Sequence, residues 1–170
     1  MGWGSRPALI MVDVCTAYWC AGSPLDTSSN PESVKSPDSM RKLVYAARQG
    51  GCPIVWTQVC YNDPEMKDAG LFYLKSKALI VWQEDDKRGL GNWVEGLQLE
   101  IGEKGSKGGE WLIKKKYPSA FFGTTLVTDL VVRGVDTVVV CGVSTSGCVR
   151  GEYAEIVRRL SLLTKSSDDA

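Results

Sequence analysis

The stretch Val138-Val-Val-Cys-Gly-Val-Ser-Thr-Ser-Gly-Cys148-Val-Arg150 decides the fold and points to the chemistry of this chain of 170 residues. An apolar, β-branched run leads into a turn of small residues, and Cys148 stands where a helical segment begins. A helix N-terminus stabilises a thiolate, so this setting predicts a nucleophilic Cys148 with a lowered pKa. The alternative is a buried structural thiol, but the turn over residues 144–147 favours the functional interpretation.

The chain contains no histidine. Catalytic units of the Ser-His-Asp and Cys-His kinds are therefore excluded, and so is any metal site that needs an imidazole ligand. If Cys148 is a nucleophile, a base of another kind must take its proton.

Strand-like and helical segments alternate along the rest of the chain. Apolar runs predict strands over residues 8–14, 52–59, 111–114 and 136–142, and periodicity predicts helices over residues 34–49, 124–132 and 148–163. Continuous apolar strands are typical of a parallel sheet that is covered on both faces. We therefore predict an α/β fold, a three-layer α/β/α arrangement around a parallel, doubly wound sheet. Short helices broken by loops are expected between residues 61 and 110.

Three reactive positions follow the ends of predicted strands. Asp13 lies near the end of the first, Lys114 and Lys115 end the third, and Cys148 follows the fourth. Such folds bind ligands beyond the carboxyl ends of their strands, so we expect these residues to meet at one rim. A carboxylate after an apolar run is costly unless it is paired or at a rim. A turn or capping role for Asp13 and a solvated surface for the lysine run are the alternatives.

Composition limits the possible partners and surroundings. The formal net charge is zero and no basic stripe stands out, so we expect no nucleic-acid partner. The longest apolar runs have the length of strands, which predicts no membrane partner, and the first residues lack the apolar core of a secretory signal. Six cysteines without a CxxC pair favour a reduced, cytoplasmic protein. We expect a single domain over residues 1–163, followed by a disordered tail over residues 164–170.

Three segments of the chain carry a resemblance to a known family. They are Ala8-Leu-Ile-Met-Val-Asp13, Lys115-Lys-Tyr-Pro-Ser-Ala-Phe-Phe-Gly-Thr124 and Val140-Cys-Gly-Val-Ser-Thr-Ser-Gly-Cys-Val-Arg150. In order and spacing, over residues 7–152, the chain resembles the isochorismatase-like cysteine hydrolases, which include N-carbamoylsarcosine amidohydrolase, maleamate-type amidases and nicotinamidases. In that family the catalytic lysine stands four residues before the serine of the second segment, which selects Lys115.

The resemblance implies a catalytic triad of Asp13, Lys115 and Cys148. Asp13 would take the thiol proton, Lys115 would hold the carboxylate, and the Cys148 thiolate would attack a small amide or carbamoyl substrate to form a thioester. The backbone N–H groups of Ser144 and Cys148 would form the oxyanion hole, next to a cis peptide bond between Val143 and Ser144. The resemblance implies no metal or other cofactor, and we expect a homo-oligomer.

The chain departs from the family's pattern in three ways. It lacks the histidines with which nicotinamidases bind metal. Gly151-Glu152 is an unusual start for the last helix, because glycine costs about 1 kcal/mol relative to alanine there. The family continues for further strands, so we expect a sheet that lacks its last strand or strands, an unpaired edge at Thr137–Cys141, and marginal stability without a partner subunit.

Two other functions stay open at this point. The first is a catalytically impaired, truncated variant that acts as an interaction or oligomerisation module. The second is vinyl-ether hydrolysis of isochorismate, but relatives of that kind do not use a cysteine nucleophile, so Cys148 speaks against it.

Overall fold

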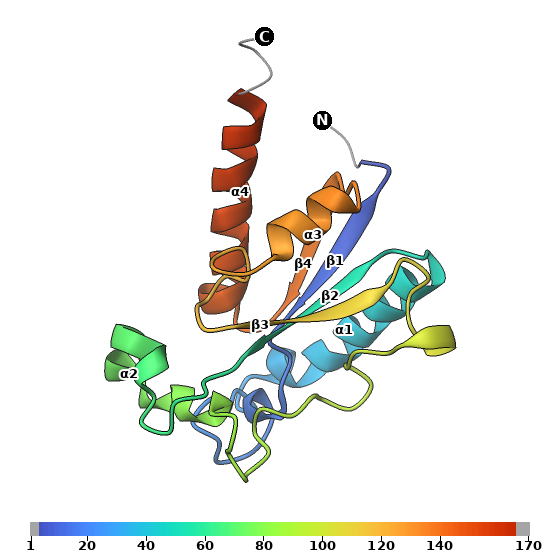
Figure 1. Ribbon diagram of the computed structural model, residues 1–170. Coiled ribbons are helices and arrows are strands. Elements are labelled where there is room, and N and C mark those ends of the chain that lie inside the picture. Colours follow the sequence, from blue (N-terminus) through green and yellow to red (C-terminus); the bar gives the residue numbers. More distant parts are fainter. Residues whose placement is uncertain (1–3, 166–170) are drawn as a thin grey trace.

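The computed structural model describes residues 4–165, and it describes side chains for residues 4–158. The sheet of this part of the chain has four parallel strands in the order β3-β2-β1-β4. Helices lie on both sides of it (Figure 1), which confirms the predicted doubly wound α/β fold. The strands are β1 (Pro7–Val12), β2 (Ile54–Val59), β3 (Glu110–Lys115) and β4 (Thr137–Gly142), and the main helices are α1 (Pro31–Gln49), α3 (Leu126–Val132) and α4 (Arg150–Lys165).

Strand β1 has apolar side chains on both faces, as its continuous apolar run predicts. Leu9 and Met11 pack with α1, through Met40 and Val44. Ala8, Ile10 and Val12 point to the other face, which α3 and the start of α4 cover. Alternate side chains of a strand point to opposite faces, so one six-residue strand supplies two separate cores.

Helix α1 begins earlier than the sequence pattern predicts. Pro31 is its first residue, and the side chain of Asn30 caps it by accepting a hydrogen bond from the backbone N–H of Glu32 at 3.0 Å. Pro31 fits here because the first helical position needs no backbone donor and favours the fixed φ of proline. The predicted start at residue 34 is therefore about one helical turn too late.

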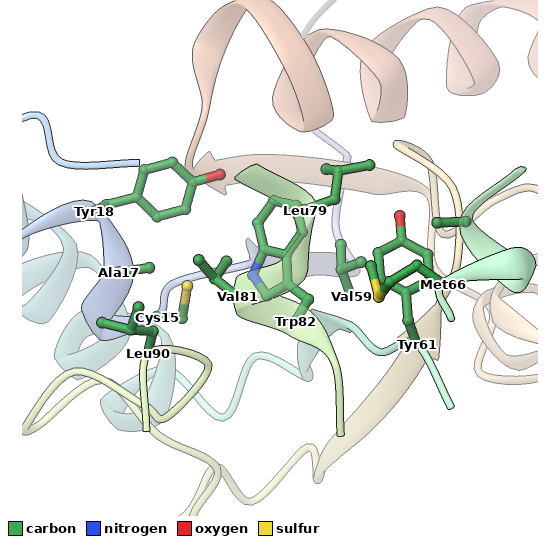
Figure 2. Close-up of a cluster of buried hydrophobic side chains, with 11 residues drawn as sticks. Cys15, Ala17, Tyr18, Val59, Tyr61, Met66, Leu79, Val81, Trp82 and Leu90 are labelled. Atoms are coloured by element: carbon green, nitrogen blue, oxygen red, sulfur yellow. The ribbon is translucent and has the colours of Figure 1, made fainter. Parts of the chain in front are cut away.

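The segment between β2 and β3 is mostly irregular, as expected. It contains the short helix α2 (Gly70–Lys75) and short 3₁₀ helices, including Lys77–Trp82. Its apolar side chains join those of residues 15–18 in what we call the rim cluster, beyond the carboxyl ends of the strands (Figure 2). The buried members of the rim cluster are Cys15, Ala17, Tyr18, Val59, Tyr61, Met66, Ala69, Leu79, Val81, Trp82 and Leu90.

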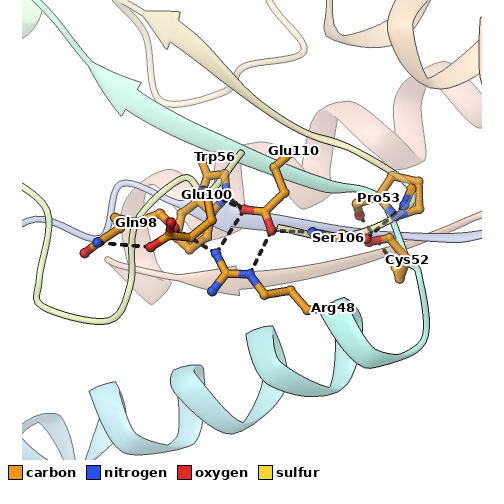
Figure 3. A network of polar contacts seen from close by, with 9 residues as sticks. Arg48, Cys52, Pro53, Trp56, Gln98, Glu100, Ser106 and Glu110 are labelled. Atoms are coloured by element: carbon orange, nitrogen blue, oxygen red, sulfur yellow. Dashed lines mark hydrogen bonds and ion pairs between the residues drawn. The ribbon is translucent and has the colours of Figure 1, made fainter. Parts of the chain in front are cut away.

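A buried carboxylate holds the opposite end of the sheet together. Glu110, the first residue of β3, accepts hydrogen bonds from Arg48 at 2.8 and 3.1 Å and from the indole N–H of Trp56 at 2.8 Å. The backbone N–H groups of Ser106 and Glu100 donate to it as well, at 2.9 and 3.2 Å. This Glu110 cluster (Figure 3) joins the end of α1, strands β2 and β3, and the loop before β3.

The chain passes from β4 to α4 through a tight turn. Gly142 has φ 135°, and a Cβ atom there would lie 2.2 Å from the backbone oxygen of Val12, so only glycine lets β4 approach β1 so closely. A π-helical turn, Thr145–Val149, follows and leads into α4. Helix α4 includes residues 164 and 165, contrary to the predicted tail, whereas 166–170 lie outside the described residues. Over the described part of the chain, no helix combines the length and apolarity needed to cross a membrane.

Candidate active site

Asp13 follows β1 directly and is fully buried as a side chain. Thr57 of the neighbouring strand β2 fixes it: the Thr57 hydroxyl donates to Asp13 Oδ1 at 2.7 Å, and the Asp13 backbone N–H donates to the Thr57 carbonyl oxygen at 3.2 Å. The backbone of Asp13 has φ 50°, a left-handed conformation that is uncommon outside glycine. Strained backbone of this kind persists where the surroundings over-determine it, often at functional sites.

Lys115 is the last residue of β3, and its side chain is also fully buried. Its ammonium group lies 3.2 Å from Asp13 Oδ2 and donates to the carbonyl oxygen of Pro118 at 2.7 Å. Lys114 instead pairs with Glu84 at the surface, and Lys116 pairs with Asp68. The structure therefore brings Lys115 to Asp13, and its two lysine neighbours point elsewhere.

Glu152 is a part of this site that the sequence analysis missed. It is fully buried, and its Oε1 lies 2.8 Å from the Lys115 ammonium. The Ser119 hydroxyl donates to Glu152 Oε2 at 3.0 Å, and the backbone N–H of Ala120 donates to both carboxylate oxygens at 2.8 and 2.9 Å. The sequence did contain one sign of this role. Glu152 stands four positions after Cys148, and residues at this spacing lie one turn apart on the same side of a helix.

Gly151 explains why the helix start looked unusual. A Cβ atom at this position would lie 3.1 Å from Cβ of Pro118, a tight contact that glycine avoids. The backbone of α4 can therefore approach the segment after β3, and this approach lets Glu152 reach Lys115. The glycine that is unfavourable for helix formation thus serves the packing of the site.

Cys148 is 7% exposed and lies close enough to Asp13 for the carboxylate to act on the pKa of its thiol. Burial and the Asp13 carboxylate raise the pKa of its thiol far above the ordinary value, and the opposing effect of Lys115 does not compensate. The predicted low-pKa thiol is therefore wrong for the site in this state. A helix N-terminus and one lysine cannot outweigh burial beside two carboxylates, Asp13 and Glu152.

One carboxylate oxygen of Asp13 still has a lone pair free to accept a proton. Oδ1 accepts from Thr57, but Oδ2 accepts no hydrogen bond of regular geometry from the side chains and backbone described here. Its charged neighbour is Lys115, and the Cys148 thiol is near enough for the Asp13 charge to raise the pKa of the thiol. This oxygen can therefore receive the thiol proton.

The remaining wall of the site contains aromatic hydroxyl groups and the predicted turn. Tyr18 and Tyr61 of the rim cluster are both close enough to Cys148 for a thiolate to raise the pKa of each phenol, in addition to the larger effect of burial. The peptide bond between Val143 and Ser144 is cis, as expected. The two tyrosines come from the irregular segments, where the sequence pattern gave no sign of which side chains turn inward.

A narrow pocket borders Asp13 and is lined by residues that include Thr57, Trp82 and Trp93. It has no room for a water-sized molecule. Within the described residues, no three His, Cys, Asp or Glu side chains gather closely enough to hold a metal ion. The arrangement can support nucleophilic attack by sulfur, with a carboxylate as base and an ammonium group beside it.

The amino-acid sequence is similar to those of several known hydrolases. It is 32% identical to maleamate amidohydrolase of Pseudomonas putida over 158 residues, which are 93% of this chain and 68% of that protein. It is 29% identical to N-carbamoylsarcosine amidase of Arthrobacter sp. over 168 residues, with 94% and 57% covered. It is 32% identical to a ureidoacrylate amidohydrolase of Klebsiella pneumoniae, with 85% and 64% covered. The chain thus spans between about half and two thirds of the length of these relatives.

Solved structures of similar proteins share the fold of this chain. N-carbamoylsarcosine amidase from Thermoplasma acidophilum has a TM-score of 0.68 at 25% identity, with 91% of this chain and 78% of that one covered. A cysteine hydrolase from Pseudomonas syringae pv. phaseolicola has the same fold, with a TM-score of 0.75 at 22% identity and with 91% and 67% covered. The model of the isochorismatase domain matches residues 7–157. The chain therefore belongs to the isochorismatase family.

Proposed function

We propose that this chain is a cysteine amidohydrolase that cleaves a C–N bond of a small amide or carbamoyl compound. The observation that carries the proposal is the convergence of Asp13, Lys115 and Cys148 from three separate segments into one buried cluster. The names of the relatives, which are amidohydrolases and an amidase, support the same reaction class. Buried ionisable groups that meet beyond the carboxyl ends of parallel strands are typical of active sites.

The first half of the proposed reaction forms a thioester. The Cys148 sulfur attacks the substrate carbonyl carbon while the thiol proton moves to Asp13 Oδ2. Asp13 then gives this proton to the nitrogen of the breaking C–N bond, and ammonia or an amine leaves. The raised pKa of Cys148 favours a proton transfer that accompanies the attack over a thiolate that forms beforehand.

The second half releases the product and restores the thiol. Water attacks the thioester carbonyl carbon and gives a proton to Asp13. The C–S bond breaks, the acid leaves, and Asp13 returns the proton to Cys148. Lys115 stays protonated throughout: burial alone would lower its pKa, but Asp13 and the other anionic neighbours outweigh burial and raise it.

The backbone N–H groups of Ser144 and Cys148 are the proposed oxyanion hole. Both residues belong to the turn between β4 and α4, so their N–H groups lie near the nucleophile. Donors that are fixed before the reaction stabilise the negative oxygen that develops during attack.

The test is a substrate screen with a matched inactive protein. Maleamate, N-carbamoylsarcosine and ureidoacrylate are the first compounds to try, since the relatives are named for acting on them. We expect release of ammonia from at least one small amide or carbamoyl compound by the wild-type chain and none by Cys148→Ala. A folded wild-type protein that releases no ammonia or amine from any of them, or a Cys148→Ala variant with wild-type turnover, would reject the proposal.

A further inference from the structure

The feature of the site that the proposed reaction does not use is Glu152. A carboxylate that is fully removed from water is costly unless it has charged and hydrogen-bonding partners. Glu152 has them all in the segment that carries Lys115, namely the ammonium group, the Ser119 hydroxyl and the Ala120 backbone N–H. The carboxylate therefore ties the beginning of α4, four residues after the nucleophile, to the end of β3.

The distances show how the Lys115 ammonium group is shared. It donates to Glu152 Oε1 at 2.8 Å and to the Pro118 carbonyl oxygen at 2.7 Å, but Asp13 Oδ2 is 3.2 Å away. Two of its three protons thus point to these closer acceptors. Asp13 Oδ2 keeps its capacity to accept a proton because Lys115 is held mainly by Glu152 and Pro118.

The charges of the cluster oppose loss of a proton to solvent. Asp13 and Glu152 each carry one negative charge and Lys115 carries one positive charge, so the cluster has a net charge of minus one while the thiol is protonated. Release of the thiol proton to water would make it minus two. Transfer of the same proton from Cys148 to Asp13 leaves the net charge unchanged, so the internal transfer is favoured over release.

We propose that Glu152 is a positioning residue that holds the ammonium group of Lys115 and, through its negative charge, retains within the site the proton that Cys148 and Asp13 share. The role in turnover rests on the proposed amidohydrolase function, but the retention of the proton can be measured without a substrate. The titratable groups that face Cys148 are Asp13 after β1, Lys115 at the end of β3, Glu152 on α4, and the phenols Tyr18 and Tyr61 of the rim cluster. Glu152→Gln removes the charge of Glu152 with little change of shape and leaves the proposed proton acceptor, Asp13, in place.

The experiment follows the rate of Cys148 alkylation by iodoacetamide from pH 6 to 10, with the modified peptide quantified by mass spectrometry. Because burial and Asp13 raise the pKa of the wild-type thiol, its rate should still be rising at pH 10. The readout is therefore the midpoint of each profile, defined as the pH at which the rate reaches half of the wild-type rate at pH 10. In Glu152→Gln we expect the midpoint to fall by at least about one pH unit, which makes labelling at neutral pH about tenfold faster. Glu152→Asp keeps the charge and should keep the midpoint of the wild type. Glu155→Gln removes one charge from the same helix outside the cluster and should also leave the midpoint unchanged.

Three results would overturn the proposal. One is a folded Glu152→Gln variant with an unchanged midpoint and only a lower melting temperature, since the residue would then be merely structural. Another is a fall of the midpoint in Glu155→Gln as large as that in Glu152→Gln. If Glu152→Gln does not fold, Glu152→Asp is the deciding variant. Its midpoint should equal that of the wild type, and a fall by a full pH unit with the charge still present would contradict the proposal. A chain without amidase activity can still show the shift, so this test fails or succeeds independently of the proposed function.

Discussion

Strand β3 has a buried ion at each end, and the two ions are satisfied in different ways. Glu110 at its start accepts five hydrogen bonds, two of them from the guanidinium group of Arg48. Lys115 at its end lies between two carboxylates, and one oxygen of Asp13 is left without a regular hydrogen bond. A complete set of partners stabilises a fold, whereas an excess charge next to an unused lone pair allows a proton to move. Buried charge alone therefore does not identify an active site.

The largest expected effect concerns turnover at the Lys115 end. Asp13→Asn, Lys115→Ala and Cys148→Ser should each lower kcat by roughly 10⁴-fold or more, because each removes a part of one proton-transfer unit. The double variant Asp13→Asn with Cys148→Ser should be hardly worse than either single variant. Steady-state rates of ammonia release measure this. Cys20→Ser, at an exposed cysteine, is the matched control with wild-type turnover. Additive losses would show that the residues do not act together.

A substitution at the Glu110 end of β3 should lower the stability of the fold and leave the rate of catalysis unchanged. Glu110→Gln weakens charged hydrogen bonds to Arg48 in a buried setting, so we expect a loss of about 1.5–3 kcal/mol in the free energy of unfolding. Chemical denaturation measures the loss, and kcat should stay within about twofold of the wild type, since a change below about 0.4 kcal/mol in the barrier is expected. A tenfold fall in kcat with unchanged stability would remove the distinction between the two ends.

Acid should act on the Glu110 cluster in a predictable direction. Burial alone would raise the pKa of Glu110, but hydrogen bonds from Arg48, Trp56 and backbone N–H groups outweigh burial and lower it. A carboxyl group whose pKa is lowered in the folded state stabilises the fold fully at a pH above its pKa in the unfolded chain, which is near 4.3 for Glu. This stabilisation is lost as the pH falls below that pKa. The wild type should therefore lose more stability between pH 5 and pH 3 than Glu110→Gln does. Equal losses in urea unfolding at these pH values would contradict this assignment.

The smallest expected effect distinguishes charge from hydrogen bonding at the Lys115 end. Ser119→Ala removes one hydrogen bond to Glu152 but leaves its charge in place. We expect a loss of about 1 kcal/mol in unfolding free energy and no change in the pH midpoint of Cys148 alkylation. If the midpoint of Ser119→Ala fell as far as the one expected for Glu152→Gln, local geometry rather than charge would control the pKa of the Cys148 thiol.

The sequence predicted the sheet well because parallel strands have a local signature. Each of the four apolar runs became a strand, with ends that differ by at most two residues, and Asp13, Lys115 and Cys148 followed from strand ends and from the resemblance. The start of α1 was predicted too late because a proline such as Pro31 fits both a turn and the first position of a helix. These errors are local and small.

The rest of the site depends on contacts between distant segments. The sequence showed Glu152 only as part of an unusual helix start, and the approach of α4 to Pro118 accompanies its burial in the structure. The raised pKa of Cys148 has the same origin, because the helix N-terminus is visible in the sequence but the burial is not. Tyr18 and Tyr61 come from irregular segments without periodicity, so no pattern could place them beside the thiol.

The central claim is that Cys148 forms a covalent bond with the substrate, and trapping that intermediate tests it most directly. The protein is mixed with an amide from which it releases ammonia, the reaction is stopped in acid within milliseconds to seconds, and the peptide that contains Cys148 is weighed by mass spectrometry. We predict an added acyl mass on Cys148 that appears before steady state and disappears when the substrate is consumed. Turnover that continues in Cys148→Ala, with no acyl mass on the wild-type peptide, would contradict the account.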